Sequence, residues 1–434
     1  MTTAIMLTHG TGGDVLPFVA IGQELRRRGH EVVLLSHHPY ATLAEAAGLT
    51  FVAVDTEAAY RRHLAQTPDL LHASGPAAIR AFYQRGGLVE QTGREVDALL
   101  AGERGGQTVL IGRHTSALAV LIAAEVLGVP SAWVAVSPTQ LLTAKAALLN
   151  LRNGLAPELD GLRARVGLPP IAAWEPWFNS TDMVLGLWPR WFDDAGVRAP
   201  DHVRLTGFAS SDGGPVVNPE VPAAAAAMLA AAEPPILITA GTGRMTHERF
   251  YQVAIDAVAR IDRAALVVTP HRSLLPDRLP DRIRWWASLP FAAVMPQVGA
   301  VIHHGGIGTA ATATAAGAPQ VILAHGADRP DNAERLAACG LATWLPVEEC
   351  ATDLVTGMLR SALAGPTGRS RAGAPAIVRV EDGTLAAAVA VERLFAGPSS
   401  AGSRRVQARL RALPAAQRQV VLAQLRARAT SAGT

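Results

Sequence analysis

The stretch that decides the fold is AIMLTHGTGGDVLPFVAIGQELRRRGHEVVLLS, residues 4–36. Its apolar run at 4–8 predicts a strand, a glycine-rich turn leads into a helical period over 16–28, and a Gly-His break precedes a second strand at 31–36. This βαβ order implies a parallel sheet with helices on its faces. Further strand-like runs lie at 51–54, 108–111, 131–136 and 183–186. We therefore expect a doubly wound α/β first half.

A second α/β half follows a connector rich in Gly, Pro, Ser and Asn, SSDGGPVVNPEVP at 210–222. Beyond it the pattern restarts with a helix near 248–260 and with strands at 236–239, 265–268, 283–286, 300–303 and 320–323. We predict an N-terminal domain over 1–211, a linker over 212–222, a C-terminal domain over 223–396 and a tail over 397–434.

The composition excludes several classes of protein. Of 434 residues, 49% are hydrophobic and 17% charged, so the chain can bury large cores and is neither disordered nor one small module. Lys and Arg number 39 against 36 Asp and Glu, which leaves no strong overall field for nucleic acid, and we expect no nucleic-acid partner. The cationic excess lies in the tail, where residues 403–434 carry seven Arg and no acid.

Targeting and redox signals are weak. Two cysteines, Cys339 and Cys350, make neither a disulfide framework nor a four-thiolate metal site, and they suit a reducing compartment. The start lacks a basic segment followed by an apolar one, and Glu125 and Pro130 interrupt the longest apolar stretch, 117–136. We expect a cytoplasmic protein without a membrane span.

Two glycine turns predict a phosphate site in the second half. The segment VIHHGGIGTAATATAAGAPQ, residues 301–320, places a strand, a glycine turn and an Ala-rich helix in succession, so amides at the helix start can hold a diphosphate without Lys. His303 and Thr309 can add hydrogen bonds. The alternative is a tight turn capped by two histidines. A second turn, 240–243, follows the first strand of the same half, and AHGADRPDNAERL follows at 324–336.

These motifs resemble a known family. HHGGIGT with GAPQVILAHGADRPDNAERL, the opening THGTGGDVLPFVAIGQELRRRGHEV and the segment NSTDMVLGLWPRWFDDAGVRAPDHVRLTGF are similar to inverting glycosyltransferases of the GT-B fold, over about residues 4–395. The resemblance is to bacterial enzymes that glycosylate lipids, sterols and macrolides, especially the rhamnosyltransferase of rhamnolipid assembly. It implies two Rossmann-like domains facing each other across a cleft, with a nucleotide-sugar donor between them.

The resemblance implies roles for individual residues at the donor. His303 would contact the diphosphate, Asp328 and Arg329 would hold the sugar hydroxyls, and Asn332 beside Asp331 would cap a helix or contact the ligand. The same site would be lined by Gly13, Gly241, Thr242, Gly305, Gly306, Gly308 and Thr309.

Two departures from the family pattern affect the donor. Relatives usually have Gln where this chain has Arg329, which donates hydrogen bonds but accepts none, so the choice of sugar is open. Many relatives that use UDP-sugars place a ribose-binding Glu eight residues after the motif histidine, where this chain has Ala311. Deoxyribose lacks the 2′-hydroxyl, so we predict a dTDP-sugar, for example of a deoxysugar such as rhamnose, in preference to a UDP-sugar.

Inverting transfer needs a base for the acceptor proton. Asp14 matches the position of the base in several antibiotic glycosyltransferases, although it could instead cap a helix that begins near Leu16. His9 is the weaker candidate, with a satisfied strand-end histidine as its alternative. No Asp-x-Asp pair occurs, and the histidines lack a clear ligand set, so we expect no essential metal or other cofactor.

Aromatic and apolar residues in the first half predict a hydrophobic acceptor. Candidates for contact are Phe82, Tyr83, Trp133, Leu141 and Trp177, the last in a WEPWF cluster that we expect to be a loop. Core packing is the alternative for each. Lipid, polyketide and peptide acceptors cannot be separated on this basis.

The tail of the chain is basic and helical in pattern. Residues 403–434 predict an amphipathic helix pair, either a solvated basic element or a docking segment for a biosynthetic synthase, since it looks like helical leaders beside synthase modules. A nicotinamide-dependent oxidoreductase is disfavoured because the second strand ends in VVLLSHH without an acid for the ribose. A sugar-nucleotide epimerase of the same architecture and a non-catalytic glycosyltransferase-like partner remain open.

Overall fold

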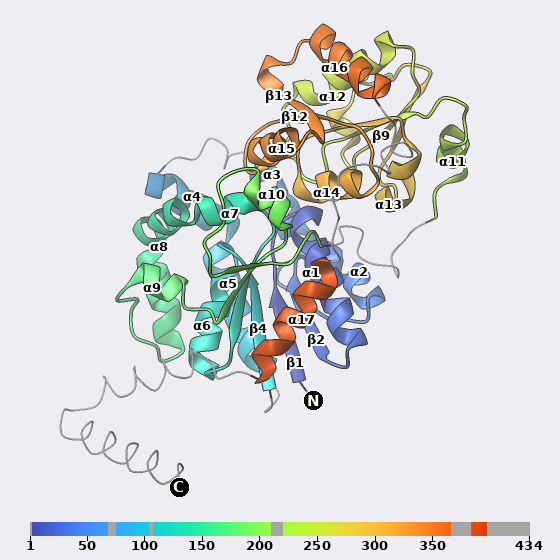
Figure 1. Cartoon of the computed structure of the whole chain (residues 1–434). Helices are drawn as coiled ribbons and strands as arrows, with labels where there is room; N and C mark the ends of the chain where they lie inside the picture. The colour runs from blue at the N-terminus through green and yellow to red at the C-terminus, as the bar shows by residue number, and fades with distance from the viewer. Residues whose placement is uncertain (1, 68–74, 104–106, 210–219, 366–382, 397–434) are drawn as a thin grey trace, which may run out of the picture.

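The computed structural model describes residues 2–67, 75–103, 107–209, 220–365 and 383–396. Two parallel sheets form two α/β domains, one above the other in Figure 1, as the sequence predicts. The N-terminal sheet has the order β3-β2-β1-β4-β5-β6-β7, with strands at Thr2–Leu7 (β1), Glu31–Ser36 (β2), Thr50–Ala53 (β3), Gln107–Arg113 (β4), Ser131–Ala135 (β5), Met183–Gly186 (β6) and Val203–Leu205 (β7).

The C-terminal sheet repeats this design with the order β10-β9-β8-β11-β12-β13. Its strands are Ile236–Thr239 (β8), Ala265–Val268 (β9), Ile283–Trp286 (β10), Ala300–His303 (β11), Gln320–Ala324 (β12) and Ala342–Pro346 (β13). In each sheet the first strand lies beside two later ones; Ile5 of β1, for example, pairs with Val33 on one side and Leu110 on the other. Chain connections leave in opposite directions at such a strand, which opens a crevice at its carboxyl end.

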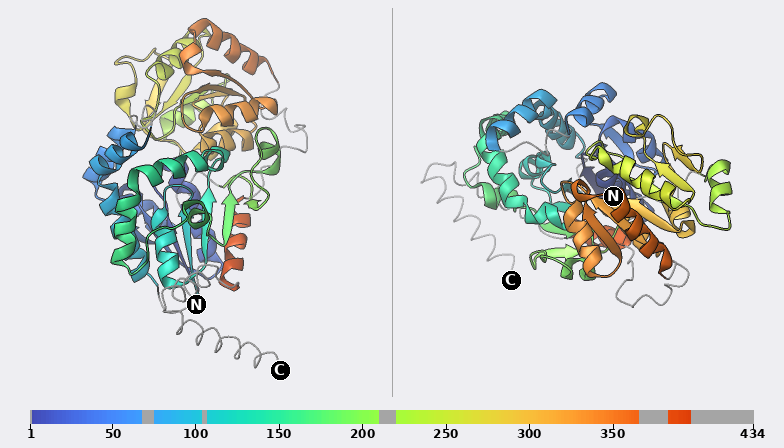
Figure 2. Two further views of the ribbon diagram at one scale, coloured as in Figure 1. Left: turned by 90° about the vertical axis from the view of Figure 1, so that its left-hand side faces the viewer. Right: turned by 90° about the horizontal axis from the view of Figure 1, so that it is seen from above.

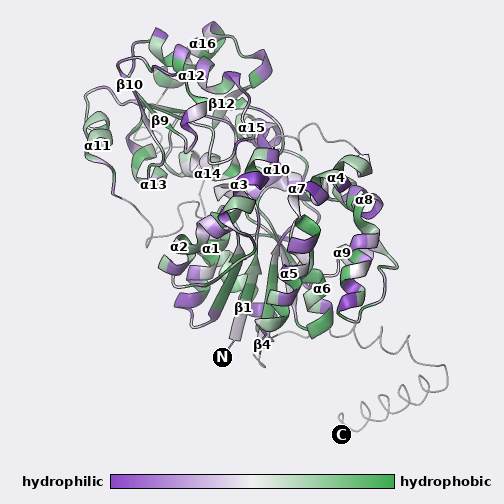
Figure 3. Ribbon diagram, turned by 180° about the vertical axis from the view of Figure 1, so that it is seen from behind, coloured by the Kyte–Doolittle hydropathy of each residue, from purple (hydrophilic) through white to green (hydrophobic). Residues whose placement is uncertain are grey.

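Helices cover both faces of each sheet (Figure 2). In the N-terminal domain they are α1 (Gly12–Arg27), α2 (Ala41–Ala46), α3 (Glu57–Gln66), α4 (Gly75–Gly86), α5 (Leu88–Ala101), α6 (Leu118–Leu127), α7 (Pro138–Leu142), α8 (Ala144–Arg165), α9 (Trp174–Phe178) and α10 (Arg190–Asp194). In the C-terminal domain they are α11 (Ala223–Leu229), α12 (Arg249–Arg260), α13 (Phe291–Val294), α14 (Ile307–Ala315), α15 (Arg329–Ala338) and α16 (Thr352–Ala364). Central strands such as β1 are therefore apolar over most of their length, from Ala4 onward in β1, and that part is coloured as hydrophobic in Figure 3.

The last described helix, α17 (Gly383–Ala396), differs from the predicted division into domains. It was expected within the C-terminal domain, but it packs against α1 and β4 of the N-terminal domain (Figure 1). Ala387, Val391 and Leu394 join the apolar core on one face of the N-terminal sheet, and Glu392 bonds to Arg28 and His30. The small apolar residues of α17 thus cover part of one face of the N-terminal sheet.

Three local predictions also differ. The WEPWF cluster is a short helix, α9, rather than a loop. The edge strands β7 and β13 were not predicted: β7 has only three residues, and β13 ends in Pro346. Helix α1 begins at Gly12, ahead of the predicted start, so Asp14 lies in its first turn and Thr11 takes the N-cap position.

Other expectations lie partly or wholly outside the described residues. The tail at 397–434 and most of the linker at 212–222 belong to these. Within the ranges given above, no helix combines the length and the apolar composition that a bilayer crossing requires.

Candidate functional site

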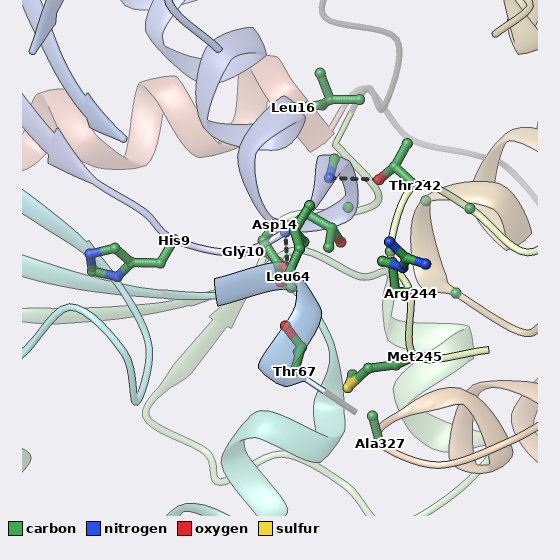
Figure 4. Close-up of a pocket in the computed structure, with 18 of the residues that line it drawn as sticks. His9, Gly10, Asp14, Leu16, Leu64, Thr67, Thr242, Arg244, Met245 and Ala327 are labelled. Atoms are coloured by element: carbon green, nitrogen blue, oxygen red, sulfur yellow. Dashed lines mark hydrogen bonds between the residues drawn. The ribbon is translucent and has the colours of Figure 1, made fainter. Parts of the chain in front are cut away.

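Loops from both domains line one cavity of about 630 Å³. The turn after β1 and the turn after β8 meet at its wall (Figure 4). The Gly12 amide donates to the Thr242 hydroxyl oxygen at 3.0 Å, and a Cβ at Gly12 would come within 3.1 Å of the same atom. The glycines of the first turn thus allow the two domains to touch at the cavity wall.

The start of α14 forms the C-terminal wall of the cavity. Gly306 takes the N-cap position, and Ile307, Gly308 and Thr309 of the first turn also line the cavity. The amides of a first helical turn have no partner within the helix and carry the positive end of its dipole. Gly305 itself lies outside the lining, with φ +89° and with the Arg329 carbonyl oxygen 2.8 Å from where a Cβ would be. This wall suits an anion such as a diphosphate.

The prediction that His303 contacts the diphosphate is wrong. Its side chain is fully buried outside the cavity, where Nε2 bonds to Gln320 at 3.0 Å and Nδ1 accepts from the Gly305 amide at 3.2 Å. The neighbouring His304 lines the cavity instead. Alternation along β11 explains the exchange, because His303 ends the strand facing the interior and the next side chain faces the opposite way.

Both histidines are held in the neutral form. Burial lowers the pKa of His303 to about 4, against the effect of Gln320. Burial, followed by the charge of Arg329, lowers the pKa of His304 well below its ordinary value. A neutral imidazole donates from one ring nitrogen only, so His304 can give a phosphate oxygen one hydrogen bond without a full charge.

The start of α15 contributes the polar residues predicted for the sugar. Asp328 and Arg329 line the cavity, and Arg329 donates to the carbonyl oxygens of Met245 and, at 2.9 Å, His325. Burial raises the pKa of Asp328, against the lowering effect of Asn332. Asn332 is buried outside the cavity and donates to the Asp328 carboxylate and to the Gly305 carbonyl, each at 3.0 Å. It connects α15 to the glycine turn and does not line the cavity.

Asp14 lies at the cavity with both carboxylate oxygens engaged. Oδ1 pairs with Nη2 of Arg113 at 2.7 Å, and Oδ2 accepts from the Thr11 amide at 3.0 Å. The alternative role, that Asp14 caps a helix near Leu16, holds in modified form: Asp14 lies in the first turn of α1, and its bond to the Thr11 amide is half of a capping box at that helix start. Arg113, at the end of β4, was missed by sequence reasoning; a charged residue closing an otherwise apolar strand was the available signal.

His9 belongs to a second polar pair. Its Nε2 bonds to the Glu95 carboxylate at 2.7 Å, and Gln91 donates to the same oxygen at 2.8 Å. Glu95 is 2% exposed; burial alone would raise its pKa, but His9 and Gln91 bring the pKa below its usual range. Figure 4 shows the His9 ring directed away from Arg244 and Met245 of the C-terminal domain. The pair therefore belongs to the N-terminal end of the cavity.

That N-terminal end is largely apolar. Phe82 and Tyr83, the predicted acceptor contacts, line it, and burial raises the pKa of Tyr83 to about 12. Further lining residues, which the sequence did not single out, are Leu43, His63, Leu64, Thr67 and Leu88. At the opposite end, residues 287–291 and Val268 supply lining that the sequence also did not single out.

Three predicted acceptor contacts lie elsewhere. Trp133 is fully buried in the N-terminal core, where its indole donates to the Phe178 carbonyl at 2.9 Å. Trp177 lies under the Arg163 guanidinium, 5.8 Å from the ring centre. Leu141 packs in an apolar cluster between the domains. Packing explains these side chains, since a single sequence does not distinguish an apolar core face from an apolar ligand site.

No group of three or more His, Cys, Asp or Glu with metal-binding geometry occurs among the residues that the structure describes.

Comparisons with known proteins match both domains. The model of the glycosyltransferase family 28 N-terminal domain matches residues 4–139, and that of the erythromycin biosynthesis protein CIII-like C-terminal domain matches residues 252–387. An O-mycaminosyltylonolide 6-deoxyallosyltransferase of Streptomyces fradiae is 31% identical over 401 residues, covering 85% of this chain and 91% of that protein. Glycosyltransferase GtfC of Amycolatopsis orientalis is 27% identical over 417 residues, covering 88% and 95%.

Solved structures share the fold. Glycosyltransferase VinC, in complex with dTDP, aligns with a TM-score of 0.64 at 21% identity over 94% of this chain and 99% of that one. Spinosyn rhamnosyltransferase SpnG aligns with a TM-score of 0.60 at 22% identity over 93% and 99%.

Proposed function

The chain belongs to the GT-B nucleotide-sugar glycosyltransferases, and from that premise we propose that it transfers a deoxysugar from a dTDP-sugar to a hydroxyl of a hydrophobic natural product, with inversion. The observation that carries the proposal is the shared cavity. The start of α14 forms one wall, Asp14 lies on the other, and the contact between Gly12 and Thr242 joins them.

The donor diphosphate binds at the start of α14 in this proposal. The amides at the helix start, the neutral His304 ring and the hydroxyls of Thr242 and Thr309 supply donors without a cationic side chain. Asp328 and Arg329 border the space that remains for the sugar. Thymidine diphosphate is the nucleotide named with VinC and with another structural neighbour, SsfS6, which supports a dTDP-sugar.

Neither histidine of the motif is followed by a ribose-binding acid at the family spacing. The eighth residue after His303 is Ala311 and the eighth after His304 is Thr312, so neither position offers a carboxylate for a 2′-hydroxyl. We therefore expect dTDP-sugars to outcompete UDP-sugars in a mixed-donor assay read by product mass. Preference for a UDP-sugar would contradict this expectation.

We also expect the reaction to need no metal ion, so added EDTA should leave turnover unchanged. Loss of activity with EDTA would contradict this expectation and would leave the choice of nucleotide unaffected.

The acceptor enters from the N-terminal end. Phe82, Leu64 and Leu88 provide apolar contact, and the His9–Glu95 pair provides one polar point. The named substrates of relatives include O-mycaminosyltylonolide in the Streptomyces fradiae enzyme and aklavinone in a 7-beta-L-rhodosaminyltransferase of Streptomyces galilaeus. These names support a polyketide-like aglycone here.

The proposed reaction is one displacement. The acceptor oxygen bonds to the anomeric carbon while the bond from that carbon to the diphosphate oxygen breaks, and the acceptor proton moves to the Asp14 carboxylate. The diphosphate leaves with its electron pair, and its negative charge is stabilised by the α14 amides and His304. His9 orients the acceptor instead of serving as the base, since its ring points away from the donor wall (Figure 4).

Replacing Asp14 tests the assignment of the base. We expect Asp14→Asn to lower turnover by about two to four orders of magnitude, the range for loss of a general base, while dTDP affinity stays unchanged. His9→Gln is the matched comparison and should raise the acceptor KM more than it lowers kcat. Full turnover in Asp14→Asn together with loss of kcat in His9→Gln would assign the base to His9.

A further inference from the structure

One buried arginine joins the domains behind the cavity. Arg335 of α15 is 1% exposed, and its guanidinium donates to three carbonyl oxygens of the N-terminal domain: Phe192 at 3.1 Å, Asp193 at 3.0 Å and Val197 at 2.9 Å. These carbonyls lie in and just after α10, which faces α15 in Figure 1. A planar guanidinium can satisfy three such acceptors at once, which an ammonium group cannot do with the same geometry.

The surroundings are shaped for this side chain. A Cβ at Gly196 would lie 2.7 Å from the Arg335 guanidinium carbon, so only glycine leaves room there. The ring of Phe192 lies 5.7 Å from the guanidinium. Nε of Arg335 donates to Asp331 at 2.9 Å, and the same carboxylate oxygen accepts from the Thr139 hydroxyl of α7 at 3.2 Å. Both side chains of this pair therefore bond across the domain boundary.

A short path leads from Arg335 to the cavity. Asn332 lies one turn earlier on α15 and bonds to both the Gly305 carbonyl and the Asp328 carboxylate. Gly305 opens the turn whose following residues begin α14, and Asp328 lines the cavity. Rotating or shifting α15 would move both groups together.

We propose that Arg335 is a positioning residue for the donor: the N-terminal domain, through its carbonyls at 192–197, fixes α15 and so holds the glycine turn and Asp328 in their binding geometry. This inference rests on the proposed function only in taking the donor to bind beside α14. Without the guanidinium, three carbonyl oxygens at the boundary lose this donor, and α15 keeps only the Asp331–Thr139 hydrogen bond and apolar packing against the opposite domain.

Titration calorimetry with dTDP tests the proposal on the full chain. We expect Arg335→Met to weaken dTDP binding by at least about tenfold, since small displacements of binding groups have large effects, and Arg335→Lys to recover part of the loss. Gly196→Ala keeps the arginine, but the added methyl group would displace its guanidinium, so this variant should also bind dTDP more weakly. The control is Arg163→Met: Arg163 is 3% exposed and bonds to Glu125 and Pro169 within the N-terminal domain alone. It should lower thermal stability and leave dTDP affinity within about twofold.

Two outcomes would overturn the proposal: folded Arg335→Met that binds dTDP as tightly as the wild type, or Arg163→Met that weakens binding equally. If the wild type binds neither dTDP nor UDP, the proposed donor fails, and amide hydrogen exchange decides the role of Arg335 independently. Exchange at 303–309 should then be faster in Arg335→Met than in the wild type and unchanged in Arg163→Met. Unchanged exchange at 303–309 in Arg335→Met would refute the positioning role of Arg335.

Discussion

Gly10 lacks a side chain where the Asp14 carboxylate lies. A Cβ there would be 2.2 Å from Oδ2 of Asp14, and the backbone has φ +118°. The carboxylate is placed by this gap, by the Thr11 amide and by Arg113 together. The position of Asp14 therefore depends on a neighbour that takes no part in the chemistry.

Gly10→Ala should separate placement from backbone strain. We expect turnover to fall by about a hundredfold, because the added methyl displaces the Asp14 carboxylate by a sizeable fraction of an ångström or more. The matched control is Gly29→Ala, at φ +92° with open space around the Cβ, which should cost about 1 kcal/mol of stability and keep full activity. The value of kcat measures the effect on turnover, and urea unfolding measures the effect on stability. Equal activity of the two variants would show that Gly10 does not place the Asp14 carboxylate.

The sequence predicts which residues line the cavity where those residues belong to a motif. Asp14, Gly306, Gly308, Thr309, Asp328 and Arg329 all line the cavity as expected. Partners were not predictable, since Arg113 and Glu95 reach the site from elements far away in the sequence. His303 and His304 are adjacent in the sequence, and only the direction of the side chain at the end of β11 decides between them.

At the scale of elements, strands surrounded by helices were the most predictable. β2, β6, β8, β9 and β11 have the predicted bounds, because they lie inside their sheets and are mostly apolar runs. The edge strand β10 also has the predicted bounds, although Arg284 and Trp285 are exposed. Helix α17 was assigned to the wrong domain, since its alanine-rich surface is compatible with either sheet. Contacts over long sequence separations, which a local pattern does not contain, decide its place.

Single substitutions in α17 should report on the N-terminal core. Val391 is fully buried there, and Val391→Asp should lower the free energy of unfolding by about 3 kcal/mol or more, because it buries a carboxylate without a partner. Leu385, 40% exposed on the same helix, provides the control: Leu385→Asp should change stability by no more than about 0.5 kcal/mol. Similar losses in both variants would mean that α17 is not packed as described; denaturant unfolding measures them.

At the scale of the whole molecule, buried neutral histidines make stability depend on pH. Burial lowers the pKa of His63 and His114 in the N-terminal domain to about 4, as it does for His303 in the C-terminal domain. The unfolded chain binds these protons near pH 6.5, so the stabilisation is complete above that pH and is lost as the pH falls toward 4.

Unfolding at several pH values tests this. Between pH 6.5 and 4 each histidine should remove up to about 1.4 kcal/mol of stability per pH unit. His303→Gln, which keeps a donor for Gln320, should flatten the dependence in that window and leave the slope above pH 7 unchanged. An unaltered slope below pH 6.5 would show that His303 does not stay neutral.

The return of α17 to the N-terminal sheet has a consequence for synthesis of the protein. Residues 387–395 complete a core that begins with β1, so the first domain to leave the ribosome is the one that must wait for the final described helix. At roughly 5–20 residues per second that wait lasts about 10 to 40 seconds, during which the apolar sides of α1 and β4 have no cover from α17. Nascent chains halted before residue 383 would be natural clients for chaperones.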